Sequence, residues 1–393
     1  MRLVVFDHQM VRSAWRRIEQ HILLGLAVVT SCTAAGANIA FAGPFVIEGG
    51  GTYDSLAAAV AAAASGSVID VVAGTYRDQS ATIPRASVLT IQSVGGMAIF
   101  DAVSPLANTQ GIIKTFGDLT VNGLEFTNAA ISNALGGNGA GIRYKRGNLT
   151  VLNSVFRNNQ EGILGDADPD GTVLIDHSTF IGNGNPTDPQ GLEHAIYVTR
   201  INSLTVQNST ITGTTGAGSN IQSRAAHTSV LDNVMDDGTV SQANYAINVP
   251  NGGEVLIAGN AIEKGSRTTN HRIVAYGAAG AGRLYSNNSL TVAGNTFTST
   301  DPHAIGVEIF SPDGLTATMT SNSYNGSFRH EIVGLSEGDA PGTSPVGGAP
   351  DPVTAVGTPV SEPGSLSLFL GALIGLIGLR AFGCAIRLRL GTV

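Results

Sequence analysis

The middle of the chain carries polar side chains of the types that chemistry on an acidic sugar requires. His194 and Tyr197 lie three residues apart, Arg224 follows Tyr197 after 27 residues, and Tyr245 follows Arg224 after 21. An arginine can hold a uronate carboxylate and make the adjacent carbon more acidic, while a tyrosine, histidine or arginine accepts the proton. These four residues are therefore the catalytic candidates. A ligand groove without catalysis, or a merely solvated face, would use the same residues.

Further hydrogen-bonding residues surround these four and are candidates for holding a substrate. They are His227, Asn248, Arg267, Asn270 and Tyr276. If the chain forms coils stacked about 4.8 Å apart, side chains spaced by about one coil line one groove. We therefore expect Tyr197, Arg224 and Tyr245 at equivalent positions of successive coils.

A second cluster, Asp166, Asp168 and Asp170, precedes a glycine in the pattern D-x-D-x-D-G. Alternating carboxylates before a glycine turn can wrap a calcium ion with oxygen ligands. The bidentate glutamate expected at the twelfth position is absent, because His177 stands there. The sequence thus leaves two interpretations open, a Ca²⁺ site and a solvated acidic turn.

These residues must be positioned by a repeated unit, which consists of a short β-rich triplet, a small polar residue, a spacer and a large apolar residue. The units recur every 24 to 35 residues, with an apolar column and, two positions earlier, a polar column. The apolar column is Phe126, Phe156, Phe180, Ile211, Met235, Ile262, Phe297 and Tyr324. The polar column is Ser154, Ser178, Ser209, Asn233, Asn260, Asn295 and Asn322, and only its first position, Leu124, is not Ser or Asn. Coils of variable length around a constant strand-turn core predict an all-β domain over 43–333, a right-handed parallel β-helix with three sheets.

The start of this domain has its own signal. Tyr53-Asp54-Ser55 can cap a short alanine-rich helix over 56–64, and Val68–Val72 reads as the first strand. A helix there would shield the edge of the first coil. The stretch from Tyr53 to Tyr76 closely resembles the opening of the pectin-lyase-like superfamily, and the resemblance covers roughly 45–330. It implies the β-helix fold far more than an activity, because this fold hosts lyases, hydrolases, esterases and inert surface proteins.

The middle coils resemble a group of exported bacterial β-helix proteins that is associated with polysaccharides without being one defined enzyme. The matching residues are His194, Ile196, Tyr197, Val198, Ser223, Arg224, Ala225, Tyr245 and Ile247. Gln222 stands where that pattern commonly has lysine, Asn248 where it has an acid, and Ala279 where it has glutamate. Missing acids weaken an acid–base mechanism and favour a binding protein.

Both ends of the chain have the features of targeting segments rather than of a folded domain. Residues 1–42 have an arginine-bearing start, an apolar run over 22–29 and the small-residue ending Ala40-Phe41-Ala42, which predicts a signal peptide cleaved by signal peptidase before Gly43. An uncleaved N-terminal anchor is the alternative, and translation from Met10 would give a signal of ordinary length. Export also suits a body without cysteine, since Cys32 and Cys384 both lie in these ends.

The C-terminal end begins with a Gly/Pro-rich linker over 334–360. Residues 361–393 then contain Glu362-Pro363, an apolar transmembrane segment and a basic end, an order that resembles the PEP-CTERM sorting signal of Gram-negative bacteria. The resemblance implies recognition by an exosortase, cleavage near Glu362-Pro363, and release or attachment at the cell surface. A plain C-terminal membrane anchor is the alternative.

Composition limits the remaining functions. A formal net charge of -8 and the lack of a basic cluster in the body exclude a nucleic-acid partner. The expected protein is an exported cell-envelope or extracellular β-helix that binds or processes an acidic polysaccharide. A polysaccharide lyase and a passive adhesive surface protein are the alternatives.

Overall fold

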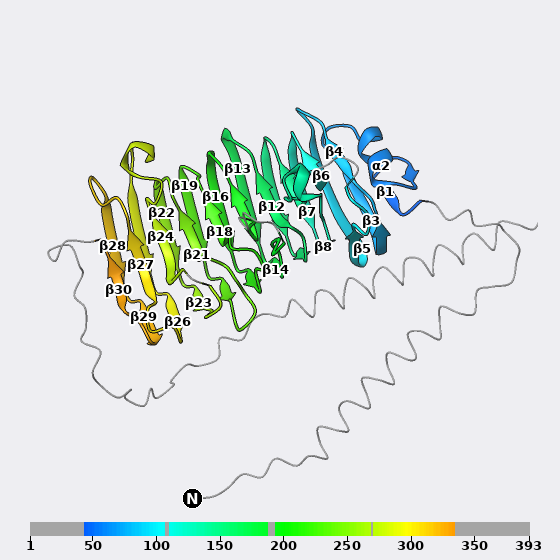
Figure 1. The fold of residues 1–393 in the computed structure, drawn as a ribbon. Coiled ribbons are helices and arrows are strands. Elements are labelled where there is room, and N and C mark those ends of the chain that lie inside the picture. The colour runs from blue at the N-terminus through cyan, green and yellow to red at the C-terminus, as the bar shows by residue number, and fades with distance from the viewer. Residues whose placement is uncertain (1–42, 107–109, 188–192, 269, 335–393) are drawn as a thin grey trace, which may run out of the picture. The chain divides into compact units, whose positions relative to one another are not determined.

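The computed structural model describes residues 43–106, 110–187, 193–268 and 270–334. They form an all-β parallel solenoid of about nine turns, which confirms the expected fold class (Figure 1). The predicted signal peptide, the linker from residue 335 onward and the sorting segment with Glu362 and Pro363 lie outside the described residues. Within the described ranges no helix is long and apolar enough to cross a bilayer.

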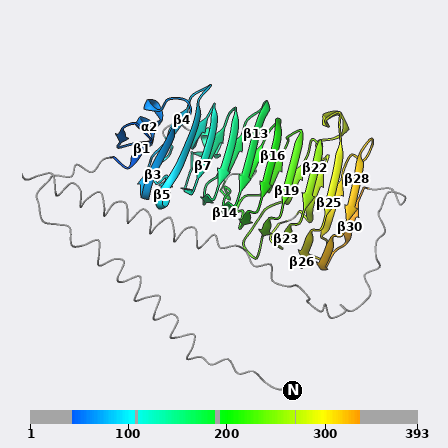
Figure 2. The same cartoon turned by 180° about the vertical axis from the view of Figure 1, so that it is seen from behind.

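The coils place their strands in three columns, and each strand pairs in parallel with its equivalents in the neighbouring coils. Strands of the first column lie side by side along the body when it is viewed from behind (Figure 2). This column contains β7 (Asp118–Asn122), β10 (Asn148–Leu152), β13 (Asp168–Asp176), β16 (Ile201–Gln207), β19 (His227–Leu231), β22 (Glu254–Ala258), β25 (Ser289–Ala293) and β28 (Thr316–Thr320). The second column contains β8 (Leu124–Thr127), β11 (Val155–Arg157), β14 (Thr179–Ile181), β17 (Thr210–Thr212), β20 (Val234–Asp236), β23 (Ala261–Lys264), β26 (Thr296–Ser299) and β29 (Ser323–Gly326).

The third column forms a separate ten-stranded sheet and carries the candidate site. Its strands are β4 (Ala81–Ile83), β6 (Gly111–Thr115), β9 (Ala140–Tyr144), β12 (Glu161–Gly165), β15 (Ile196–Val198), β18 (Ser219–Ser223), β21 (Tyr245–Val249), β24 (Arg272–Tyr276), β27 (Ile305–Ile309) and β30 (His330–Val333). Short 3₁₀ turns lie in two of the connecting loops, η1 (Asn133–Leu135) and η2 (Ala281–Arg283).

The N-terminal end of the solenoid is built differently. Strand β1 (Phe45–Ile47) pairs antiparallel with β2 (Thr52–Tyr53) and with β3 (Val68–Arg77), so one edge of β3 is already paired. Helix α2 (Leu56–Ala62) is capped by Ser55, whose side chain accepts the N–H of Ala58 at 3.2 Å, and it ends two residues before the predicted boundary. Strand β3 extends beyond the predicted Val68–Val72, because it runs through the first and second columns, as does β5 (Val88–Asp101).

The predicted core column is confirmed by the strand register. Phe126, Phe156 and Phe180 pair in successive strands of the second column, and the remaining members continue the row to Tyr324. The first three rings stack with centroids 5.1 and 4.7 Å apart. Burial of a continuous row of aromatic and aliphatic side chains provides the main hydrophobic stabilisation of each coil.

The polar column forms a hydrogen-bonded ladder inside the corner between the first two columns. Each backbone N–H donates to the side-chain oxygen of the next coil, as from Ser209 to Asn233 at 2.9 Å and from Asn233 to Asn260 at 2.9 Å. The residue before each ladder position has positive φ, for example Asn153 at 48° and Asn208 at 50°. Such left-handed corners favour Asn, Asp and Gly, which explains the composition of the repeat.

Candidate functional site

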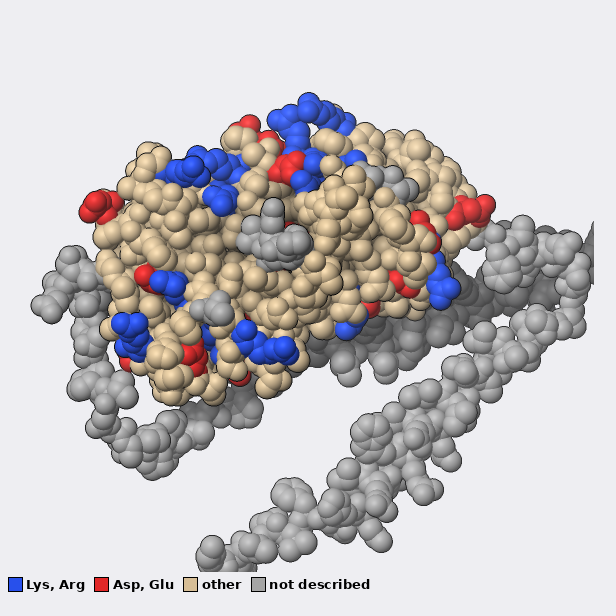
Figure 3. Space-filling view, viewed as in Figure 1, with Lys and Arg blue, Asp and Glu red and all other residues tan. Residues whose placement is uncertain are grey.

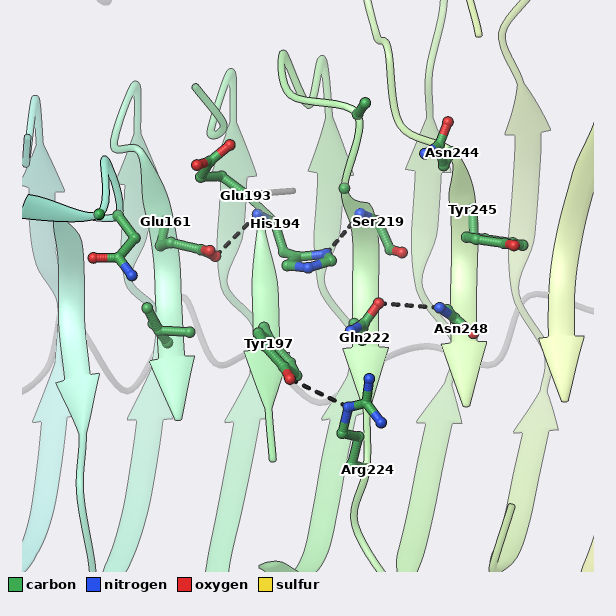
Figure 4. A pocket seen from close by; sticks show the side chains of 15 residues that line it. Glu161, Glu193, His194, Tyr197, Ser219, Gln222, Arg224, Asn244, Tyr245 and Asn248 are labelled. Carbon is green, nitrogen blue, oxygen red and sulfur yellow. Dashed lines mark hydrogen bonds between the residues drawn. The ribbon is translucent and has the colours of Figure 1, made fainter. Parts of the chain in front are cut away.

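A pocket of about 440 Å³ opens on the outer face of the third column, around β12, β15, β18 and β21. All four predicted catalytic residues, His194, Tyr197, Arg224 and Tyr245, line it, together with the predicted binding residue Asn248 (Figure 4). Figure 3 shows that charged side chains gather in small groups near the edges of the body and leave most of the visible face uncharged.

The register differs from the expected one, although the residues converge. Tyr197 pairs with Gln222, and Gln222 with Asn248, whereas Arg224 lies just beyond the end of β18. Tyr245 pairs with Ser219 at the start of the strand. The expectation that Tyr197, Arg224 and Tyr245 occupy equivalent positions was wrong, because loops of different length enter the strands. Tyr245, Tyr197 and Arg224 therefore stand at three different levels along the strands.

His194 is buried and electrically neutral. Its Nδ1 accepts the backbone N–H of Ser219 at 2.7 Å, and burial lowers the pKa of the imidazole to about 3. Because Nδ1 is an acceptor, Nε2 carries the proton of the neutral ring and is a donor. The ring lies against Tyr197, with centroids 5.0 Å apart. His194 is thus suited to donating a hydrogen bond and unsuited to being a base.

The close approach of Gly218 to His194 depends on the absence of a side chain. A Cβ at Gly218 would lie 2.1 Å from the carbonyl oxygen of Glu193 and 2.8 Å from Nδ1 of His194. Any larger residue would displace the imidazole or the backbone that carries it.

Arg224 provides the positive charge of the pocket. Its Nε donates to the hydroxyl of Tyr197 at 3.2 Å, and its Nη1 donates to Oδ1 of Asn251 at 2.7 Å. A guanidinium has five N–H donors in a planar fork, so further donors remain for a carboxylate. Arg224 is half-buried, which strengthens such a contact compared with one in open water.

Two acids in the pocket, Glu161 and Glu193, were missed by the sequence analysis. Glu161 accepts the backbone N–H of His194 at 2.9 Å, and burial raises the pKa of its carboxyl well above the usual range. A protonated carboxyl here is another hydrogen-bond donor. The sequence did contain a signal for Glu161. Glu161 precedes Ile163 by the same spacing as His194 precedes Ile196, and the two isoleucines pair in register.

Two side-chain amides contact each other across neighbouring coils in the pocket. Nδ2 of Asn248 donates to Oε1 of Gln222 at 3.0 Å. If both side-chain amides were flipped, the hydrogen bond would remain, with Gln222 as the donor and Asn248 as the acceptor. These are the positions where the resembling group commonly has lysine and an acid, so the pocket keeps a cross-coil contact there but not an ion pair.

The other predicted binding residues do not line this pocket. His227 lies in a separate hollow of about 190 Å³, with Nδ1 3.3 Å from Glu254. Arg267 is exposed, and Oδ1 of Asn270 accepts the backbone N–H of Arg272. Tyr276 is fully buried and donates to the carbonyl of Gly253 at 2.9 Å. For Tyr276 the prediction was wrong, because alternation along β24 turns its side chain into the core.

Two carboxylates of the predicted acidic turn contact other residues of the protein. Asp166 contacts Arg143 at 2.6 Å and Lys145 at 2.7 Å, and Asp168 accepts the backbone N–H of Gly147 at 2.8 Å. Asp170 is exposed. In the described part of the chain no group of three or more His, Cys, Asp or Glu side chains could hold a metal ion. The geometry does not support the Ca²⁺ interpretation, because β13 begins at Asp168 and cations of the preceding coil occupy the place of the ion.

Fold and pocket together define a class, that of parallel β-helix proteins with a polar pocket on an outer strand column. No protein-family model and no curated protein matches the chain. Among solved structures, an alginate lyase from Paenibacillus sp. str. FPU-7 is 17% identical with a TM-score of 0.49, covering 71% of this chain and 96% of that one. The A-module of the mannuronan C-5 epimerase AlgE4 from Azotobacter vinelandii is 13% identical with a TM-score of 0.31, covering 68% and 91%. Both likenesses are too distant to support a conclusion about activity.

Proposed function

We propose that the pocket binds a uronate residue of an acidic polysaccharide and that the protein acts as a glycan-binding component of the cell envelope. One observation carries this proposal, namely that Arg224 converges with neutral donors and amides in one open pocket. Arg224 would hold the carboxylate, while His194, Gln222 and Asn248 would bind the sugar hydroxyls. A single cation among several hydrogen-bonding groups suits a polyhydroxylated anion.

Export and sorting belong to the same proposal. A signal peptide over 1–42 and a sorting tail over 361–393 would bring the domain to the surface of a Gram-negative cell, with signal peptidase and an exosortase as processing partners. A polymer-binding domain is useful there because its ligand is outside the cell.

Retention on immobilised polymer tests the binding. The full chain is passed over pectate, alginate and the producing cell's own exopolysaccharide. We expect retention on at least one uronate polymer, and Arg224→Ala should weaken binding by roughly tenfold or more, the value of a charge-assisted hydrogen bond. Arg157→Ala is the matched control, because Arg157 pairs with Glu125 on the second column. Absence of retention on all three polymers would refute the proposal.

A polysaccharide lyase is the second candidate, favoured by the contact between Arg224 and the hydroxyl of Tyr197. In β-elimination a base removes the proton adjacent to the carboxylate, and the glycosidic oxygen leaves with a proton from an acid. His194 is a poor base, so Tyr197 and Tyr245 are the candidates for both transfers. The absorbance of an unsaturated uronate product should then rise with the native chain and stay flat with Tyr197→Phe. A flat trace with the native chain alongside retention on the column identifies a binding protein.

A further inference from the structure

Arg224 is held from two sides by residues outside the pocket's strands. Oδ1 of Asn251 accepts Nη1 of Arg224 at 2.7 Å, and the hydroxyl of Tyr285 donates to the carbonyl oxygen of Arg224 at 2.9 Å. Asn251 is 3% exposed, so its amide is shielded from water. Side chain and main chain of the same arginine are therefore both tethered.

Both tethers lead to one loop, residues 277–288, between β24 and β25. Nδ2 of Asn251 donates to the carbonyl of Arg283 at 2.8 Å, and the N–H of Tyr285 donates to the carbonyl of Asn251 at 3.1 Å. Arg200 also donates to the carbonyl of Arg283, and its guanidinium lies over the ring of Tyr285 at 5.1 Å. The loop thus reaches back to residues of three earlier coils, Asn251, Arg224 and Arg200.

We propose that the loop of residues 277–288, acting through Asn251 and Tyr285, is the positioning element of Arg224. It fixes the guanidinium against Tyr197 and leaves the remaining donors at the pocket for a carboxylate. This inference rests on the proposed function for the identity of the ligand, but not for the immobilisation itself. A fixed guanidinium loses less conformational entropy when it binds an anion, so the loop contributes to affinity without touching the ligand.

The test measures how fast phenylglyoxal modifies Arg224 in the full chain, followed by peptide mass spectrometry, with Arg157 as an internal reference. Asn251→Ala should speed the reaction at Arg224 by roughly tenfold, the worth of a charge-assisted hydrogen bond. The carbonyl of Arg283 keeps its bond from Arg200 in this variant, which protects the fold. Tyr285→Phe removes only a neutral hydrogen bond and should give a roughly threefold increase. Asn287→Ala, at an exposed position of the same loop, should leave the rate unchanged.

Asn251→Asp separates positioning from charge. The carboxylate still accepts from Arg224, so the slow modification should return, while affinity for an acidic oligosaccharide should fall because the new charge offsets that of Arg224. Equal modification rates at Arg224 in the native chain, Asn251→Ala and Tyr285→Phe would overturn the inference. If the native chain binds no uronate oligosaccharide but Asn251→Ala still accelerates modification, the positioning stands and the proposed function fails.

Discussion

Two single residues, His194 and Lys264, show how burial controls charge. His194 is kept neutral, whereas Lys264 is a fully buried cation that donates to the carbonyls of Ala243 at 2.6 Å and Asn244 at 2.9 Å. Asp237 lies 4.0 Å from its Nζ. Lys264 thereby fixes the backbone that leads into Tyr245, a pocket residue. Both residues couple the geometry of the pocket to pH.

Acid should destabilise the protein through His194. Its folded pKa of about 3 lies below the ordinary 6.5, so the unfolded chain binds the extra proton first, and stability falls as pH drops from 6.5 towards 3. The loss is roughly 5 kcal/mol at about 1.4 kcal/mol per pKa unit. Thermal melts of His194→Asn should show a shallower acid dependence than the native chain. His330→Asn, at an exposed position of β30, is the control and should keep the native slope.

Alkali should act in the opposite sense through Lys264. Burial lowers the pKa of its ammonium from 10.5 to about 8, so the unfolded chain holds the proton longer, and stability rises between pH 8 and 10.5. The gain is roughly 3 kcal/mol. Denaturant titrations at several pH values measure the rise in the free energy of unfolding. Lys264→Met should flatten this rise, while Lys114→Met, on the outer face of β6, should leave it unchanged. A rise that survives in Lys264→Met would show that another group titrates.

Among the elements, the ladder of Ser and Asn side chains ties the corners of successive coils together. Asn260 is central, because its Oδ1 accepts the N–H of Asn233 and its Nδ2 donates to the carbonyl of Val230 at 2.8 Å. Its amide is 1% exposed, so no water can replace these bonds.

Asn260→Ala should therefore lower the free energy of unfolding by roughly 2 to 4 kcal/mol, since several buried groups lose their partners. Urea unfolding measures the change. Asn325→Ala, at an exposed position near the C-terminal end of the solenoid, should change stability by less than about 0.5 kcal/mol. A loss at Asn260 no larger than at Asn325 would mean that the ladder is not a main source of corner stability.

For the whole molecule, stacking makes each coil depend on its neighbours. Among the described residues, the last strands, β28 to β30, pair only with strands of the coil before them, whereas β1 pairs with the edge of β3 at the other end. In such a one-dimensional architecture the stability of the body is a sum over coils and their interfaces.

We expect a chain truncated to residues 43–334 to melt within about 2 °C of the full chain, because the described hydrophobic core lies between these bounds. Differential scanning calorimetry of both forms checks this. A drop of more than about 5 °C on truncation would instead show that the removed ends stabilise the body.

The sequence by itself determined the architecture. Its periodic apolar and polar columns, from Phe126 to Tyr324 and from Ser154 to Asn322, could be predicted because a solenoid repeats the same local contacts, so spacing along the chain reports position in space. The four residues of the pocket were also found, since their types stand out against a weakly charged body. Signal and sorting segments remain predictions.

Only the tertiary structure decided how the site is built. Loop lengths vary from coil to coil, so the sequence spacing could not give the register that pairs Tyr197 with Gln222 or the return of residues 277–288 to Arg224. Burial is likewise a property of the folded chain: it raises the pKa of Glu161 and lowers that of His194, and it encloses Tyr276 in the core. The chemistry of the pocket therefore depends on long-range packing that no local pattern encodes.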